Sequence, residues 1–293
     1  MSNHLTPEAR SESLIEALPY IQEFRGQTFV IKYGGAAMED EQIVEKFLRD
    51  VVFLEAVGIN PVLVHGGGKA ITARMREAGL KAQFINGLRV TDEAAIRIVE
   101  STLDGVINPE IVKTITDFHG RAIGLSGKDV FVARKLPEQK LEGGGTMDIG
   151  FVGEAASMRT AAIVKAIGQE VVPVISPIGA TEDGTVLNIN ADVAAAALAG
   201  ELKASKLIFV SDVPGIMRDP ESPDSLIPTV TAAQAESLIK SKVIAGGMIP
   251  KVKSAVAALG NGVQKIHLIG GHIQHCLLLE IFTNAGIGSE IVP

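Results

Sequence analysis

Short apolar runs alternate along the chain with longer segments in which apolar positions recur every three or four residues. Runs of about 4–8 residues rich in Val and Ile are typical of buried strands, and the wider spacing is typical of amphipathic helices. The pattern predicts strands at residues 28–33, 61–65, 171–176, 206–211, 265–269 and 289–292. It predicts helices at residues 40–57, 69–78, 93–104, 109–118, 158–167, 192–199, 231–240, 250–260 and 275–282. The alternation favours an α/β fold, an open and mostly parallel sheet sandwiched between helices in three layers.

An additional helix is expected before this pattern begins. It spans residues 6–18, with Thr6 as its cap and Pro19 interrupting it. Its apolar stripe consists of Leu14, Leu18 and Ile21. Because an apolar stripe outside the main body needs a partner, the segment is either an oligomerisation helix or a leader packed on the body.

A second departure from the alternation lies in the middle of the chain. Residues 130–135 and 151–154 flank the glycine run 143–145. This arrangement predicts a hairpin or small antiparallel unit. The glycine run is either a surface turn or a lid over a substrate.

Composition excludes several classes of protein. The chain has 293 residues, 46% hydrophobic, with 4% aromatics and no Trp, so it can bury a large aliphatic core. Its formal charge of -7 disfavours general nucleic-acid binding, which needs concentrated positive charge. A single cysteine, Cys276, excludes an intrachain disulfide and fits a reducing compartment. The first residues lack a secretion signal, and no apolar stretch reaches the ~20 residues of a membrane helix, so we expect a cytoplasmic protein without a membrane partner.

Lysines and glycines follow two of the predicted strands. Lys32 closes the first strand and precedes Gly34-Gly35, while Gly66-Gly67-Gly68 and Lys69 follow the second. Ligands of open α/β sheets bind at the carboxyl ends of the strands. Glycine also lets backbone N–H groups approach phosphates closely. The two turns therefore predict a site for a nucleoside triphosphate.

Familiar nucleotide and catalytic motifs are absent. Gly68-Lys69 is followed by Ala70, where a Walker A motif has Ser or Thr, and no strand–GxGxxG–helix unit, GxSxG, HExxH or paired CxxC occurs. The segment 272–276 offers too few ligands for a metal, so we predict no metal site. His65 follows a buried strand, and we expect it to form local hydrogen bonds rather than to act as an acid or base.

Further polar residues lie at the ends of predicted helices and strands. They are Asn188, Asn190 and Asp192 ahead of an apolar helix, Ser211 and Asp212 after a strand, and Lys251 beside the glycine turn 246–247. Phosphoryl transfer depends on positioning and on neutralising the charge of the phosphoryl oxygens, which ammonium groups and backbone dipoles supply.

Five segments, at 31–35, 64–68, 86–91, 188–192 and 247–251, resemble the amino acid kinase family. The resemblance covers nearly the whole chain from Thr28 to Pro293. The Asn-Gly-Leu-Arg-Val-Thr sequence at 86–91 resembles the branch that acts on N-acetyl-L-glutamate in arginine biosynthesis. The resemblance implies ATP-dependent phosphorylation of the side-chain carboxylate of N-acetyl-L-glutamate, giving N-acetyl-L-glutamyl 5-phosphate. A carboxylate is ionised at neutral pH, so this nucleophile needs no general base.

The resemblance also implies roles for individual residues. Lys32 and Lys251 flank the migrating phosphoryl group, and Asp192 organises both ammonium groups. Arg89 holds the substrate α-carboxylate in a bidentate fork. The implied substrate contacts are Gly67, Gly68, Arg89 and Asn188, and the implied nucleotide contacts are Gly34, Gly35, Ser211 and Asp212. Mg²⁺ would accompany ATP, held mainly by phosphates and water.

Regulation and assembly are implied in the same way. The segment 270–288 resembles the arginine-inhibitor site of feedback-inhibited members, with Tyr20, Glu280 and Gly286 as candidate ligands of L-arginine. Residues 1–26 would form the helix that joins dimers into a hexamer, a trimer of dimers. A kinase domain would follow at 27–293, with a substrate lobe over about 27–200 and a nucleotide lobe over about 201–293. A PII-type signalling protein is a further candidate partner.

Two alternatives remain. The chain could be an aspartate, glutamate or carbamate kinase, which the segment 86–91 disfavours. It could instead be a non-catalytic arginine sensor, which the presence of Lys32, Asp192 and Lys251 together disfavours.

Overall fold

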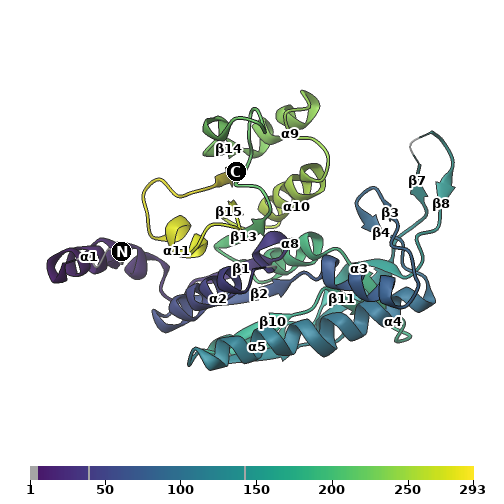
Figure 1. The fold of residues 1–293 in the computed structure, drawn as a ribbon, viewed down its shortest axis with the longest axis horizontal. Coiled ribbons are helices and arrows are strands. Elements are labelled where there is room, and N and C mark those ends of the chain that lie inside the picture. Colours follow the sequence, from purple (N-terminus) through teal and green to yellow (C-terminus); the bar gives the residue numbers. More distant parts are fainter. Residues whose placement is uncertain (1–5, 39, 142) are drawn as a thin grey trace.

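A computed structural model describes residues 6–38, 40–141 and 143–293. Within these ranges a central sheet of eight strands has the order β14-β16-β15-β13-β1-β2-β10-β5 (Figure 1). The strands are β1 (Thr28–Tyr33), β2 (Asn60–His65), β5 (Ala122–Leu125), β10 (Val172–Ile175), β13 (Lys206–Ser211), β14 (Thr229–Thr231), β15 (Lys265–Gly270) and β16 (Ser289–Val292). Neighbours pair in parallel except β15 and β16. The six predicted strands are confirmed to within one residue at each end, whereas the short strands β5 and β14 were not predicted.

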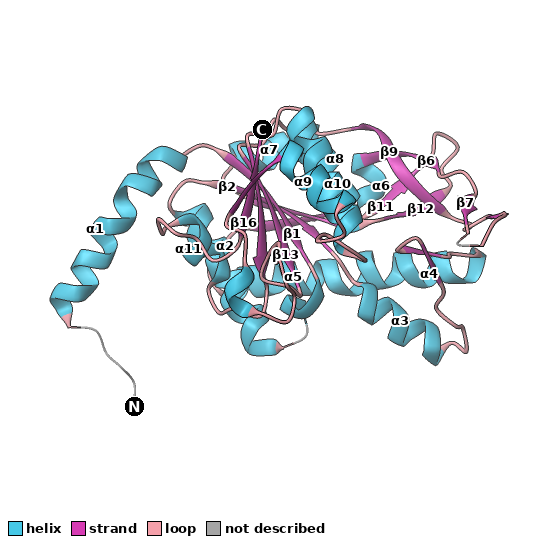
Figure 2. Cartoon of the chain, turned by 90° about the horizontal axis from the view of Figure 1, so that it is seen from above, coloured by secondary structure: helices cyan, strands magenta, loops and turns pink. Residues whose placement is uncertain are grey.

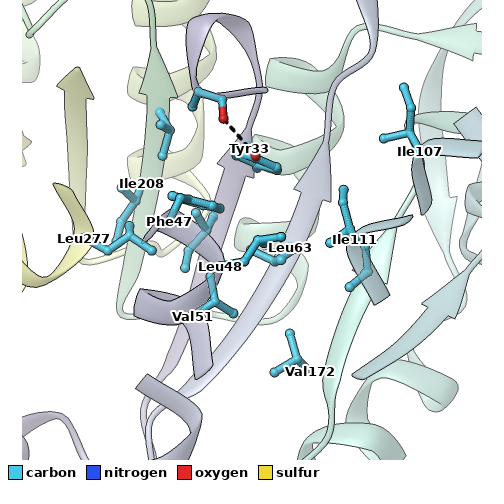
Figure 3. Close-up of a cluster of buried hydrophobic side chains, with 14 of the residues drawn as sticks. Tyr33, Phe47, Leu48, Val51, Leu63, Ile107, Ile111, Val172, Ile208 and Leu277 are labelled. Carbon is cyan, nitrogen blue, oxygen red and sulfur yellow. Dashed lines mark hydrogen bonds between the residues drawn. The ribbon is translucent and has the colours of Figure 1, made fainter. Parts of the chain in front are cut away.

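Helices cover both faces of the sheet. On one face lie α2 (Glu41–Ala56), α5 (Asn108–Asp117) and α11 (Cys276–Ile281), and on the other α7 (Ala161–Gly168), α8 (Ala191–Glu201) and α10 (Met248–Gly260). Figure 3 shows Phe47, Leu48 and Val51 of α2 packed against Leu63 and Ile208 of the sheet. The three-layer α/β prediction is confirmed.

One connection differs from its prediction. We expected a break between helices 93–104 and 109–118, but a π-helical turn, Leu103–Ile107, joins α4 (Glu93–Thr102) directly to α5. The π turn absorbs Gly105 without ending the helix, so α4, the turn and α5 form one continuous helical segment. Further helices of the body are α3 (Gly68–Glu77), α6 (Gly127–Val130) and α9 (Ala232–Lys240).

A smaller β unit adjoins the main sheet. β6 (Phe131–Lys135) and β9 (Val152–Met158) pair in antiparallel fashion, which confirms the predicted antiparallel unit. They close a small barrel with β11 (Ile178–Ala180) and β12 (Val186–Ile189), neither of which was predicted. Short hairpins β3–β4 (Phe84–Ile85, Leu88–Arg89) and β7–β8 (Gln139–Lys140, Thr146–Met147) stand beside it. The helix predicted from residue 158 was placed too early, because β9 continues through Met158 and α7 begins at Ala161.

The N-terminal helix α1 (Pro7–Phe24) leads away from the body (Figures 1 and 2). It continues through Pro19, so the predicted interruption was wrong. A proline in a helix removes one backbone hydrogen bond, and here the helix tolerates that loss on its exposed side. Leu14 and Ile15 are each 68% exposed, so the first half of α1 packs on nothing within the described chain. Residues 1–5 of the predicted segment lie outside the described residues.

No helix in the described part of the chain is both long and apolar enough to cross a membrane. The division into two lobes near residue 200 stays a prediction.

Candidate functional site

A cavity of about 1020 Å³ opens at the carboxyl ends of β1 and β2. Strand order changes direction here, since β1 lies between β2 and the much later β13. Such switch points are where open α/β sheets bind ligands. Predicted site residues that line the cavity are Lys32, Gly35, Gly67, Gly68, Arg89, Asn188 and Asp212.

Two lysines and one aspartate meet at this edge. Lys32 is the penultimate residue of β1, and its Nζ lies 3.2 Å from Asp192 Oδ1 in an ion pair. Lys251 Nζ donates a hydrogen bond of 2.8 Å to Asp192 Oδ2. Asn190 caps α8 by accepting from the N–H groups of Asp192 and Val193, which fixes Asp192 in the first helical turn. The predicted arrangement of an acid between two ammonium groups is therefore present in the fold.

The charged groups of this cluster shift one another's pKa values. Burial would raise the pKa of Asp192, but the ammonium groups of Lys32 and Lys251 outweigh burial and hold that pKa below its ordinary value. Burial lowers the pKa of Lys251, and Asp192 opposes this. Lys251 also lies 5.1 Å from the centroid of the Phe209 ring, a cation–π contact. Two ammonium groups surround the Asp192 carboxylate, and Asp212 adds a second negative charge that, like Asp192, acts to raise the pKa of Lys251.

Glycines on the β1 side allow a close backbone approach. Gly35 has a φ of +67°, and a Cβ there would lie 2.2 Å from Asp212 Oδ1. A Cβ on Gly34 would lie 2.7 Å from Lys32 Nζ. Ser211 is buried, and its hydroxyl donates to the Val213 carbonyl, so it faces the loop backbone. Asp212 is the member of this predicted pair that lines the cavity.

Arg89 is attached to the second glycine turn. Its Nη2 donates to the Gly68 carbonyl and to Thr72 Oγ1, each at 2.8 Å. The guanidinium lies 4.7 Å from the Phe84 ring centroid, and burial lowers its pKa. With five N–H groups it can hold these partners and still donate to a ligand carboxylate. Asn188 lines the same cavity and donates to Thr91 Oγ1 at 3.3 Å.

The three predicted arginine-site residues surround a second polar cluster. Glu280 accepts from the N–H groups of Ile287 and Gly288, and a Cβ on Gly286 would lie 2.8 Å from Glu280 Oε2. Tyr20 packs edge-on against Phe282 and donates to Asn284 Oδ1. The second half of α1 thus brings Tyr20 to the segment that follows α11.

Sequence reasoning missed two members of this cluster, His267 and Lys206. His267 Nδ1 contacts Glu280 Oε1 at 2.6 Å, and its Nε2 lies 3.1 Å from Lys206 Nζ. Burial lowers the pKa of Lys206 to about 8. The available signal was a lysine followed directly by four apolar residues of a predicted strand. Lys206 begins β13 and Asp212 follows its end, so the two clusters lie at opposite ends of one strand, roughly 20 Å apart for a rise of six residues.

No three His, Cys, Asp or Glu side chains gather as a metal site within the described ranges. In the segment 272–276, His275 Nδ1 instead pairs with the buried Asp50 Oδ1 at 2.6 Å.

Comparisons with known proteins agree with this geometry. A model of the amino acid kinase family matches residues 27–270. The acetylglutamate kinase of Akkermansia muciniphila is 53% identical over 281 residues, covering 95% of this chain and 94% of that protein. The N-acetylglutamate synthase from Neisseria gonorrhoeae, solved with coenzyme A and N-acetyl-glutamate, superposes with a TM-score of 0.84 at 29% identity, over 97% of this chain and 63% of that one. The same synthase solved with coenzyme A and L-arginine gives a TM-score of 0.79 at 28% identity, over 96% of this chain and 65% of that one. On its sequence match and on its fold, the chain belongs to the amino acid kinase family.

Proposed function

We propose that this chain transfers the γ-phosphoryl group of ATP to the side-chain carboxylate of N-acetyl-L-glutamate, giving ADP and N-acetyl-L-glutamyl 5-phosphate. The observation that carries the proposal is the shared carboxylate of Asp192, which holds Lys251 close to Lys32, and Lys32 lines a cavity that two glycine turns also line. The high identity to an acetylglutamate kinase supports this choice of substrate.

The reaction joins two anions, so charge is the obstacle. A carboxylate oxygen attacks the γ-phosphorus, and the bond from that phosphorus to the β–γ bridging oxygen breaks as ADP leaves. The nucleophile is already ionised, so no proton has to be removed. We assign Lys32 and Lys251 to the oxygens of the migrating group, where preorganised positive charge lowers the barrier. Asp192 touches neither substrate and keeps the two ammonium groups in place.

Each glycine turn serves one substrate in this proposal. Gly34 and Gly35, with Ser211 and Asp212, lie on the nucleotide side. On the acceptor side, the backbone N–H groups of Gly67 and Gly68 bind the acceptor, and the Arg89 guanidinium and the Asn188 amide recognise its α-carboxylate and acetamido groups.

Mg²⁺ fits this site as an ion that arrives with the nucleotide. The described residues hold no cluster that would bind it alone, whereas Asp212 stands beside the glycine turn where phosphates would lie. When bound, it would neutralise phosphate charge, mainly through phosphate and water ligands.

We further propose feedback inhibition by L-arginine at the second cluster. Glu280 is a buried carboxylate suited to a guanidinium, and Tyr20 couples this place to α1. The exposed stripe of Leu14, Ile15 and Leu18 would pair with another copy, joining dimers into a hexamer. A PII-type partner and a cytoplasmic location stay predictions.

A coupled ADP-release assay tests the function. N-acetyl-L-glutamate, L-glutamate, L-aspartate and carbamate are each supplied with ATP and Mg²⁺, with and without L-arginine. Of the four acceptors, we expect only N-acetyl-L-glutamate to be phosphorylated, and we expect L-arginine to inhibit that reaction. Turnover with another acceptor would reassign the substrate, and no turnover with any acceptor would favour the arginine sensor.

A further inference from the structure

His65 is buried directly behind the Gly66–Gly68 turn and has no place in the mechanism described so far. Its side chain is 0% exposed. Nδ1 lies 2.9 Å from the Gly66 carbonyl oxygen, and Nε2 lies 3.3 Å from Asn108 Nδ2. Asn108 Nδ2 also donates to the Val174 carbonyl at 2.9 Å. These contacts link the end of β10, the start of α5 and the glycine turn.

The partners of His65 decide which ring nitrogen carries the proton. Burial lowers its pKa to about 4, so the ring is neutral at pH 7. A carbonyl oxygen only accepts, so Nδ1 carries the hydrogen and donates to Gly66. Nε2 is then an acceptor, which matches the Asn108 amide group that the Val174 carbonyl holds in its donor orientation.

Anchoring this carbonyl also orients the next N–H group. The Gly66 C=O and the Gly67 N–H belong to one trans peptide plane, in which they point in opposite directions. Because the carbonyl is held toward the buried ring, the Gly67 N–H is turned away from it. Gly66, Gly67 and Gly68 all line the cavity, whereas His65 is not among its lining residues.

The π turn supports the same peptide from another side. A Cβ on Gly67 would lie 2.6 Å from Ile107 Cδ1 and 2.7 Å from Leu103 Cδ2, so both ends of the turn pack on this glycine. Asp104 within the turn accepts from the hydroxyls of Ser126 and Ser176. Asn108, the partner of His65, is the residue directly after the turn. Single π turns inside helices are often found at functional sites.

We propose that His65 is a positioning residue: through an Nδ1–H tautomer fixed by Asn108, it aims the Gly67 N–H at the phosphoryl acceptor. The inference rests on the proposed function, in which Gly67 binds the acceptor.

Two variants of His65 distinguish a positioning role from one in which the side chain only fills space. In His65→Asn, Nδ2 takes the place of the imidazole Nδ1 and keeps the bond to Gly66. In His65→Leu, the volume is filled without a donor. We expect kcat/KM for N-acetyl-L-glutamate to fall about 10²-fold in His65→Leu, as on loss of one preorganised donor, and only several-fold in His65→Asn. KM for ATP should stay nearly unchanged in both variants.

The matched control is Leu54→Ala, a fully buried residue of α2 that does not line the cavity. Its thermal stability should fall without a selective change in KM for N-acetyl-L-glutamate. Wild-type kinetics in His65→Leu, equal losses in the Asn and Leu variants, or the same loss in Leu54→Ala would each overturn the proposal.

The tautomer can be read in the unaltered chain, which keeps the test valid if His65→Leu does not fold. Nitrogen-15 NMR of histidine-labelled protein, assigned with His65→Asn, should show the Nδ1–H form at pH 7. An Nε2–H form would refute the proposal. If the tautomer is as expected but the wild-type chain does not phosphorylate N-acetyl-L-glutamate, the proposed function fails separately.

Discussion

Lys251 and Asp192 join the start of α10 to the first turn of α8 through a hydrogen bond of 2.8 Å. Both side chains are largely buried, so this bond is shielded from solvent and salt. The Asp192 carboxylate therefore fixes the position of the Lys251 ammonium group at the end of its long side chain.

Lys251→Ala and Lys32→Ala should each lower kcat by about 10²–10³-fold, because each removes a preorganised positive charge at the phosphoryl group. Both variants should still fold. Lys253→Ala, an exposed lysine on the same helix, is the matched control and should keep normal turnover. Steady-state kinetics and circular dichroism measure the two effects. Near-normal kcat in either lysine variant would remove that residue from the mechanism.

Arg89→Lys should raise KM for N-acetyl-L-glutamate about 10-fold or more and leave KM for ATP nearly unchanged. An ammonium cannot hold the Gly68 carbonyl, Thr72 and a ligand carboxylate in one planar fork. Varying each substrate in turn gives both constants. A selective defect for ATP would assign Arg89 to the nucleotide side instead.

Stability should depend on pH through His65. The unfolded chain takes up a proton near the ordinary pKa of 6.5, whereas the folded chain does so only near pH 4. Between these values the unfolded state binds more protons, so the free energy of unfolding falls as pH is lowered from about 6.5 to 4. At pH 5 the loss is about 2 kcal/mol relative to pH 8.

Asp50 acts in the opposite direction, since burial raises its pKa to about 6, so its contribution falls as pH rises through that region. Comparing wild type with His65→Asn by urea denaturation at each pH cancels the Asp50 effect. The difference in unfolding free energy between the two proteins should shrink below pH 6.5. A difference independent of pH would show that His65 titrates alike in the folded and unfolded states.

Leu14→Glu combined with Leu18→Glu should reduce the assembly from hexamers to dimers and weaken arginine inhibition, with basal kcat unchanged. Both side chains are exposed, so charges there do not disturb the described core. These substitutions are sharper than removing residues 1–26, which would also delete the buried Phe24 that packs on Phe29. Sedimentation velocity and arginine inhibition curves on one sample measure the two effects. An unchanged oligomer would mean that α1 does not join the dimers.

The central sheet was predictable because its strands are nearly continuous apolar runs, as in β1 and β13, where every side chain is at least half shielded. The strands that were missed are short or mixed. β12 carries Asn188 in a four-residue strand, and β5 is partly exposed, so neither shows a clear period. The interruption wrongly predicted at Pro19 came from the rule that proline breaks helices, which the rest of α1 outweighs.

The site residues also fall into those that a local sequence pattern predicts and those that it does not. Lys32 and the glycine turns were visible because a charge or a flexible residue directly followed an apolar strand. The cap by Asn190, the support from Asn108 and the pair of Lys206 with His267 depend on contacts between distant segments. Lys206 reaches His267 only because β13 and β15 are neighbours, a pairing that no local pattern encodes.

The position of β1 between β2 and β13 also has a consequence for how the protein folds. During synthesis β1 can pair with β2 almost at once, but its other edge stays open until residues 206–211 emerge. Pairing across such a sequence separation is slow and leaves an unpaired edge that can associate with other chains. Aggregation of nascent or refolding chains should therefore compete with folding chiefly before β13 docks. Lys32, near the end of β1, becomes largely buried only once β13 has docked.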